Sequence, residues 1–347
     1  MFGNLRGWII SAVLLAGLGW LCKVIYDFGK PTAAAPIPKL VDGKPSRETI
    51  RPRDSLVALA LPIAPSAIVQ PTVDGNAGDA LRAALELYRD PTTRRAYERF
   101  ASRNRNAGDY DALPKAPIEK LIEAGPMRQM RFLSTGDLDR IINYDTRNRP
   151  DLNDLQQLAG VASTLANYRA FKPPGSDRMV DPAGARKLFE ALFLIGQKLF
   201  EERVVYDEMQ LGLELMAGAT GGLMKLAEAE RNVEMLGRLR AFDEARVQYV
   251  TGHILPIWRV ISSIDDGVIA RHAGNVFLLA MEGEDRMWRV EALLKLGRYR
   301  FHATRAGDQS TANRVLKQIA ASEADPVIQH AARTARDLTS AQHNLSR

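Results

Sequence analysis

The chain has 347 residues and a mass of 38.4 kDa, with 25% charged and 46% hydrophobic residues, which are ordinary values for a folded protein. Its net charge is +6, but the excess lies in the front half: residues 29–150 hold 20 Lys and Arg against 15 Asp and Glu, whereas residues 151–347 hold 25 of each. The single cysteine, Cys22, excludes a disulfide and a thiolate metal site from the rest of the chain.

An apolar segment near the N-terminus, residues 8–28, predicts a transmembrane helix that follows a short tail, residues 1–7. It reads WIISAVLLAGLGWLCKVIYDF, and about 20 apolar residues are needed to span a hydrocarbon core of roughly 30 Å. Trp and Tyr residues near both ends suit the two interfaces of a bilayer. The alternative is a cleaved signal peptide ending near Ala35, although Pro36 directly after that site is unfavourable for cleavage.

Two patterns in the sequence make opposite predictions for the orientation of this anchor. Arg6 precedes the helix, whereas Lys23, Lys30 and Lys39 lie at or after its far end, and the positive-inside rule would place the body in the cytoplasm. A short tail, one helix and a stalk rich in Pro and Ala are instead typical of a signal anchor that exports the C-terminal part. We therefore expect the body on the exported, periplasmic side of a bacterial membrane, with the cytoplasmic face as the alternative.

Residues 29–75 predict a proline-rich linker. Eight prolines occur between Gly29 and Val73, and proline lacks an N–H donor and disfavours a helical conformation in the preceding residue. One apolar patch, Leu56 to Leu61 with Ile63, is expected to lie on the folded body as a short strand or strap.

Residues 76–265 predict an α-helical domain, so the expected fold class is all-α. Four prolines fit the first turn of a helix, where the missing N–H is tolerated, and they stand at positions 91, 117, 150 and 182. Apolar residues recur every three or four positions in 152–165 and on two sides of 188–200, which predicts helices packed against neighbours. The proline-free stretch from about 222 to 251 predicts one long helix with a solvated face.

The last segment, residues 266–347, contains two similar stretches 40 residues apart: DRMWRVEA, which starts at Asp285, and DPVIQHAA, which starts at Asp325. An Asp at a turn, then an apolar residue, then alanines at helical spacing resembles the second helix of HEAT repeats, whose period is roughly 40 residues. The resemblance covers about residues 268–340. It implies two stacked helical pairs in which Ala292 and Ala332 face neighbouring helices, and the alternative is an ordinary pair of helical hairpins. Arg298 is expected to be exposed.

No motif in the sequence predicts a catalytic, cofactor-binding or metal-binding residue. The five histidines occur in no zinc or di-iron spacing, and no phosphate-binding loop or nucleophile elbow is present. Three groups of carboxylates could serve acid–base chemistry, but each flanks an expected helix end where solvated acids are common: Glu201 with Glu202, Asp207 with Glu208, and Asp265 with Asp266.

One basic cluster offers a possible contact with an anionic partner. It surrounds Tyr97 and Phe100, contains Glu98 as its one acid, and consists of Arg94, Arg95, Arg99, Arg103 and Arg105. Such a helix could bind anionic lipid headgroups, an acidic protein or, less favourably, nucleic acid. The near-neutral charge of the remaining body provides no extended basic stripe, and a solvated helix face is the plain alternative.

These patterns together favour a single-pass membrane protein whose helical body is a scaffold or adaptor for a protein partner. The alternative is a helical-bundle enzyme or cofactor-binding protein whose site is assembled from residues distant in sequence. A convergent pocket with several charged residues would favour the enzyme, and an open surface would favour the scaffold.

Overall fold

The computed structural model describes residues 40–41, 44–45, 61–101, 113–130, 138, 142, 150–171, 180–262, 273–302 and 306–340. Across these residues the chain is mostly helical, which confirms the all-α fold class. Among the helices described, none combines the length and the apolarity that a membrane span needs. The predicted anchor, residues 8–28, lies outside the described residues.

The front part of the chain contains short strands and small helices. In chain order these are β1 (Leu40–Val41), β2 (Lys44–Pro45), the 3-10 turn η2 (Pro65–Ala67), β3 (Val73–Asn76), α2 (Ala77–Arg89), α3 (Pro91–Ala101), α5 (Ala116–Ala124) and β4 (Met127–Gln129). β3 pairs with β4 in a parallel ladder, with Val73 opposite Met127. This ladder was not expected, because its strands are too short to show an alternating pattern.

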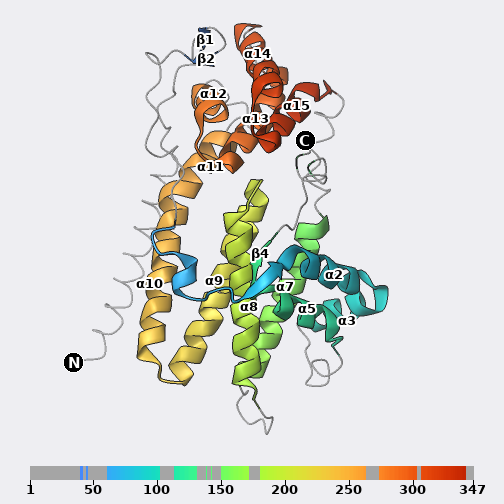
Figure 1. Ribbon diagram of the computed structural model, residues 1–347, viewed down its shortest axis with the longest axis vertical. Helices are drawn as coiled ribbons and strands as arrows, with labels where there is room; N and C mark the ends of the chain where they lie inside the picture. Colours follow the sequence, from blue (N-terminus) through green and yellow to red (C-terminus); the bar gives the residue numbers. More distant parts are fainter. Residues whose placement is uncertain are drawn as a thin grey trace, which may run out of the picture.

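Longer helices form the rest of the body. They are α7 (Pro150–Ala170), α8 (Pro182–Glu201), α9 (Tyr206–Ala229), α10 (Val233–Tyr249), the π-helical turn η4 (Val250–Ile254), α11 (Leu255–Ser262), α12 (Ala273–Glu282), α13 (Arg286–His302), α14 (Ala306–Ser322) and α15 (Pro326–Asp337). Figure 1 shows α2 to α10 in one half of the molecule and α11 to α15 in the other.

The four predicted proline starts are confirmed. Helices α3, α7 and α8 begin at Pro91, Pro150 and Pro182, and α5 carries Pro117 in its first turn. The carboxylate of Asp90 accepts hydrogen bonds from the backbone N–H groups of residues 92 and 93, as an N-cap residue does.

Helix α8 is the centre of the larger half and packs against α9, α7 and α5. Both of its predicted apolar stripes are buried, from Leu188 to Phe200, as expected for a helix enclosed by neighbours. Gly196 and Gly212 let α8 and α9 approach closely: a Cβ on either glycine would lie 2.7 Å from the carbonyl oxygen of the other. Helix α9 is continuous through the Gly218 to Gly222 segment.

The predicted linker is described only in part. Leu61 and Pro65 are buried and Ile63, Ile68 and Val69 pack against the same core, so this part lies as an irregular strap on the body. Residues 56–60 of the expected apolar patch lie outside the described residues.

The prediction of one long helix from about 222 to 251 was wrong. Helix α9 ends at Ala229 and α10 begins at Val233, and between them Arg231 adopts a left-handed backbone conformation with a φ of 57°. The side chain of Asn232 accepts a hydrogen bond of 3.0 Å from the N–H of Met235 and thereby caps α10. Asn232 is a favourable N-cap residue, but the stretch contains no proline and its charges are evenly distributed, so the sequence pattern did not predict a turn here.

A single helical rod joins the two halves. Helices α10 and α11 run into each other through η4, along one side of the molecule (Figure 1). The buried residues of the rod are spaced by three or four positions except at η4, where Tyr249 and Ile254 are five apart. The π turn therefore marks the point where the rod leaves one half and enters the other.

The C-terminal half contains two helix pairs, α12 with α13 and α14 with α15. Helices α13 and α15 begin 40 residues apart, at Arg286 and Pro326. Asp285 and Asp325 cap these helices in the same way, accepting hydrogen bonds of 2.9 and 2.8 Å from the N–H groups two residues on. Ala292 and Ala332 are fully buried, whereas Arg298 is half-buried and not exposed as expected.

Candidate functional site

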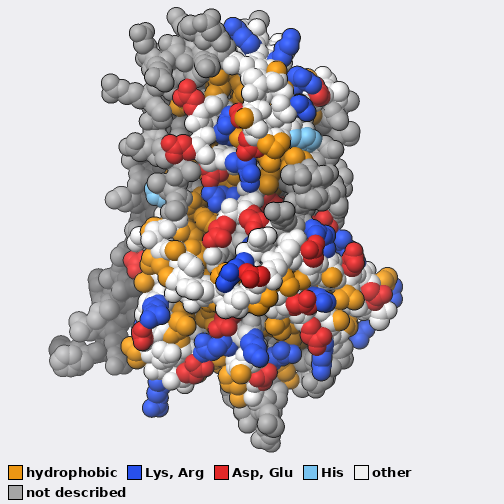
Figure 2. Space-filling model, viewed as in Figure 1, with side chains coloured by type: hydrophobic (Ala, Val, Ile, Leu, Met, Phe, Trp, Pro, Cys, Tyr) orange, Lys and Arg blue, Asp and Glu red, His pale blue; other side chains and the backbone are white. Residues whose placement is uncertain are grey.

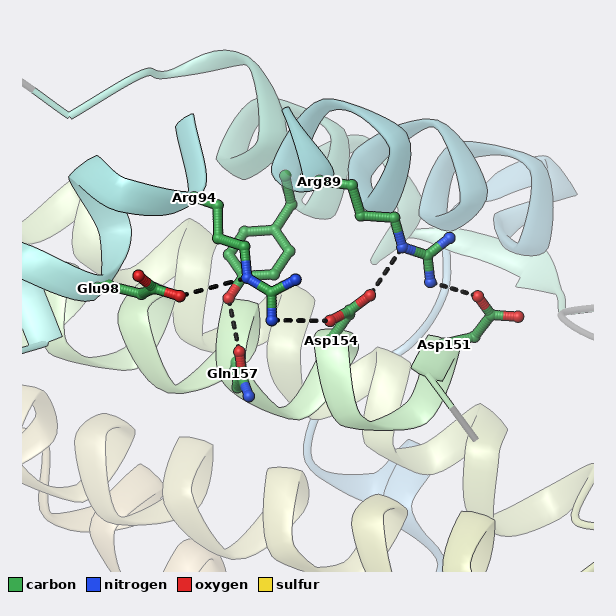
Figure 3. A network of polar contacts seen from close by, with 7 residues as sticks. Arg89, Arg94, Glu98, Asp151, Asp154 and Gln157 are labelled. Carbon is green, nitrogen blue, oxygen red and sulfur yellow. Dashed lines mark hydrogen bonds and ion pairs between the residues drawn. The ribbon is translucent and has the colours of Figure 1, made fainter. Parts of the chain in front are cut away.

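The predicted basic cluster is divided by the fold. Arg94 lies in an ion-pair network, with its guanidinium 3.3 Å from Glu98 on the same helix and 3.9 Å from Asp154 on α7 (Figure 3). Arg95 and Arg99 are exposed on α3. Arg103 and Arg105 lie outside the described residues, and the anionic-partner hypothesis for the cluster stays a prediction.

The network around Arg94 joins α2 and α3 to α7. Arg89, at the end of α2, donates hydrogen bonds of 2.5 Å to Asp151 and 2.7 Å to Asp154, and both acids lie in the first turns of α7 (Figure 3). Their negative charges also suit the positive end of the α7 dipole. The hydroxyl of Tyr88 donates to Gln157 at 2.7 Å, and burial raises the pKa of this tyrosine. The arrangement fixes two helices to a third.

The aromatic residues of the basic cluster belong to the core. Tyr97 and Phe100 are 1% and 0% exposed, and the Tyr97 hydroxyl donates a 2.6 Å hydrogen bond to the carbonyl of Pro114. Burial raises the pKa of Tyr97 well above its usual value. These rings cannot stack on nucleotide bases without unfolding of α3.

Acidic and basic side chains are interspersed over the face of the body that Figure 2 shows, with hydrophobic side chains between them. A protein that binds the phosphate backbone of nucleic acid usually has its cations gathered in one patch or stripe. On the described part of that face, cations are interspersed with acids and do not form one such stripe.

Three of the carboxylates singled out in the sequence form hydrogen bonds within the fold. Glu202 accepts a hydrogen bond of 2.8 Å from the N–H of Met130, and Glu201 accepts one of 2.8 Å from Gln197. Glu208 is buried and accepts from the N–H groups of Val204 and Val205, at 2.6 and 3.2 Å, ahead of α9. Asp265 and Asp266 lie outside the described residues.

A groove between α7 and α9 holds the remaining one of these carboxylates, Asp207. We call it the α7–α9 groove, and its volume is 150 Å³. Its lining comprises Leu152, Asn153, Gln156, Asp207, Gln210, Leu211 and Glu214. The two leucines are buried and form an apolar floor, while the polar side chains are exposed and form the rim.

Glu214 is held in place at this rim by two amides. Its carboxylate oxygens accept hydrogen bonds of 3.1 Å from Gln156 on α7 and 2.8 Å from Gln210 on α9. Both donors are uncharged, so they orient the carboxylate without neutralising it. Sequence reasoning missed this site, because the two glutamines and the glutamate resemble ordinary solvated residues and Gln156 is far from Glu214 in the chain.

A second polar cluster lies where the two halves meet. We call it the junction, and it consists of Arg203, Tyr206, Trp258, Asp285 and Glu291. Arg203 forms an ion pair with Asp285, and Glu291 accepts a hydrogen bond of 2.8 Å from the backbone N–H of Tyr206. The rings of Tyr206 and Trp258 stack with their centroids 3.8 Å apart. These contacts connect the start of α9 with α11 and α13.

Lys198 is a buried cation at the end of α8. Its ammonium donates hydrogen bonds to the carbonyls of Ala124 and Gly125, at 3.3 and 2.5 Å, and so caps the C-terminal end of α5. Burial lowers its pKa to about 8, although the charges of Glu202 and Glu201 act in the opposite direction. The described residues contain no group of three or more His, Cys, Asp or Glu side chains that could hold a metal ion.

Neither a family model nor a curated protein nor a solved structure matches this chain. The geometry described above is therefore the basis for a functional proposal.

Proposed function

We propose that this chain is a single-pass membrane protein whose helical body is a scaffold or adaptor for a protein partner. The observation that carries the proposal is the α7–α9 groove, an open site with an apolar floor and a polar rim. This layout matches the anatomy of a protein–protein contact, in which apolar residues are surrounded by polar ones.

The size of the groove favours a protein partner over a small substrate. Pockets that enclose a small molecule usually measure about 300 to 1,000 Å³, and the groove measures 150 Å³. A side chain of a partner could enter such a space while the rest of the partner lies on the surrounding surface. An enzyme with this fold would instead need a deeper site where several charged groups converge.

The junction supports the same proposal, because a scaffold must present its surfaces in a fixed relationship. The ion pair of Arg203 with Asp285 is largely buried, and the rings of Tyr206 and Trp258 stack between α9 and α11. The helix pairs after the junction resemble a short HEAT-like array, which would extend the surface available to a partner. We propose residues 8–28 as the anchor that keeps this surface at a membrane.

Two experiments on the full-length chain test the proposal. In carbonate extraction of membranes the protein should remain in the pellet, and its appearance in the supernatant would exclude an integral anchor. In affinity purification from detergent-solubilised membranes, mass spectrometry should identify a protein that co-purifies in near-equal amount. Recovery of the chain without any such protein, from cells in which it is naturally produced, would contradict the scaffold function.

A further inference from the structure

We infer that the α7–α9 groove binds a basic segment of the partner protein, with an arginine or lysine side chain placed between Asp207 and Glu214. This inference rests on the proposed function and adds the chemistry of the partner. Its starting point is the composition of the lining, which contains two carboxylates, three carboxamides and two leucines and includes no cation.

The carboxylate of Glu214 is oriented before any partner binds. Gln156 and Gln210 each donate one hydrogen bond to it, from opposite sides of the groove. An ionised carboxylate has about four lone-pair sites, so these two bonds leave capacity for a further donor. A guanidinium or ammonium group would supply that donor together with the charge that the amides lack.

The start of α9 does not require the charge of Glu214. Glu208 and Glu291 already accept hydrogen bonds from the backbone N–H groups of Val204, Val205 and Tyr206, where the positive end of the helix dipole lies. Glu214 lies two turns further along α9, beyond the range of that dipole. Its charge is therefore directed at the groove and not at the helix terminus.

The carboxylates of the groove also act on Tyr206, the residue before Asp207. The pKa of the neighbouring Tyr206 hydroxyl is raised, first by burial and then by the charges of Asp207, Glu291 and Glu214. Such charges attract a cationic segment and accelerate its association. The buried floor of Leu152 and Leu211 adds an apolar contact, so the matching segment carries a basic residue beside an apolar one.

A pair of peptides tests the charge selection directly. The first probe is the capped peptide Leu-Arg-Ala-Leu-Arg, and the second replaces both arginines with citrulline, which has nearly the same shape and no charge. Methyl NMR of the full-length protein in neutral detergent, with labelled leucines, follows the signals of Leu152 and Leu211. We expect the arginine peptide to shift both signals saturably and to bind at least tenfold more tightly than the citrulline peptide.

Two variants test whether the carboxylates of the rim cause this selective binding of the arginine peptide. The double variant Asp207→Asn with Glu214→Gln keeps the size of both side chains and should weaken binding of the arginine peptide at least tenfold. Glu234→Gln, an exposed site on α10, is the matched control and should leave binding unchanged. Equal binding of the two peptides, no shift at the two leucines, or equal losses in the double variant and the control would each overturn the inference.

The double variant also distinguishes a failure of this inference from a failure of the proposed scaffold function. If the wild-type chain and the double variant capture the same protein partner equally well, the groove is not the binding site and the scaffold function stands. If wild-type protein forms a dimer that the double variant does not form, a second copy of this chain occupies the groove, and the inference about a different partner is overturned.

Discussion

Arg203, in the connection between α8 and α9, donates a hydrogen bond to the carboxylate of Asp285, the residue that caps α13. The two residues thus connect the α8–α9 corner in the larger half with the start of α13 in the C-terminal half. A related contact follows in the chain, where Arg289 on α13 donates 2.6 Å to Glu323, just before α15. Arginine–carboxylate pairs therefore join the α8–α9 connection to the start of α13, and α13 to the α14–α15 connection.

Loss of the first pair should destabilise the protein strongly. The side chains of Arg203 and Asp285 are 15% and 9% exposed, and removal of Arg203 leaves the buried charge of Asp285 without this counter-ion, with hydrogen bonds from the backbone N–H groups of α13 still in place. We expect Arg203→Met to lower the free energy of unfolding by about 2 to 4 kcal/mol. The control is Arg238→Met, whose pair with Glu234 is 59% and 76% exposed and should contribute within about 0.5 kcal/mol. Thermal melting compares the two, and similar melting temperatures would contradict the role of the junction.

Two glycines of α9 should respond in opposite ways to alanine. A Cβ at Gly212 would lie 2.7 Å from the carbonyl oxygen of Gly196 and 2.8 Å from the backbone nitrogen of Phe200. Backbone atoms cannot move aside, so Gly212→Ala should cost about 1 to 3 kcal/mol or more. A Cβ at Gly218 meets no atom within 4 Å, and Gly218→Ala should stabilise the helix by about 0.5 to 1 kcal/mol. Denaturant unfolding measures both, and a stable Gly212→Ala protein would show that the two helices can separate.

The buried alanines of the C-terminal pairs provide a third test. Ala292→Arg and Ala332→Arg each place a large charged side chain in a site with no exposed surface, so each should lower stability by more than about 2 kcal/mol. Arg333→Ala is the matched control in α15, because Arg333 is exposed and should change stability by no more than about 0.5 kcal/mol. If both arginine variants have the melting temperature of the wild-type protein, these alanines do not form helix contacts. If Ala332→Arg alone is tolerated, α15 is a loosely packed end.

The lowered pKa of Lys198 predicts that the stability of the protein depends on pH. Its pKa falls from 10.5 to about 8 on folding, so between these values the unfolded chain retains a proton that the folded chain has released. Stability should therefore rise as the pH rises from about 8 towards 10.5, by about 3 kcal/mol at most, and should be constant with respect to this group below pH 8.

Denaturant unfolding at roughly pH 7.5 to 9.5 measures this rise before tyrosines begin to titrate. The Lys198→Met variant carries no titratable group at this position and should lack the rise. An equal rise in the variant would assign the effect to another group. A rise absent from both proteins would show that Lys198 remains charged when it is buried.

The features predicted correctly from the sequence depend on residues that are close together in the chain. Pro91, Pro150 and Pro182 start helices because the first turn needs no N–H from them, and this holds whatever surrounds the helix. The apolar stripes of α7 and α8 were likewise correctly assigned to the core, because burial of one face follows from helical periodicity. Asp285 and Asp325 gave the starts of α13 and α15 for the same local reason.

Features that depend on residues far apart in the chain could not be predicted. The carboxylate of Glu214 meets Gln156 only because α7 packs beside α9, and Lys198 is buried only because the end of α5 lies over it. Arg94 was assigned to an exposed basic face, but Asp154 on α7 approaches it. A charge that looks solvated in a single helix acquires its environment from the neighbouring helices, which no local pattern encodes.

The π turn η4 sets the rotational phase of the rod that joins the two halves. A turn with i→i+5 hydrogen bonds holds one residue more than an α-helical turn, and one residue corresponds to about 100° of rotation about the helix axis. Deletion of Gly252 would therefore turn Ile257 and Ile261 away from their buried positions, although a Cβ added at Gly252 itself would meet no atom within 4 Å. A joint of this kind arises by insertion of a residue and not by substitution, so the length of residues 250–254 is a stricter constraint than their composition.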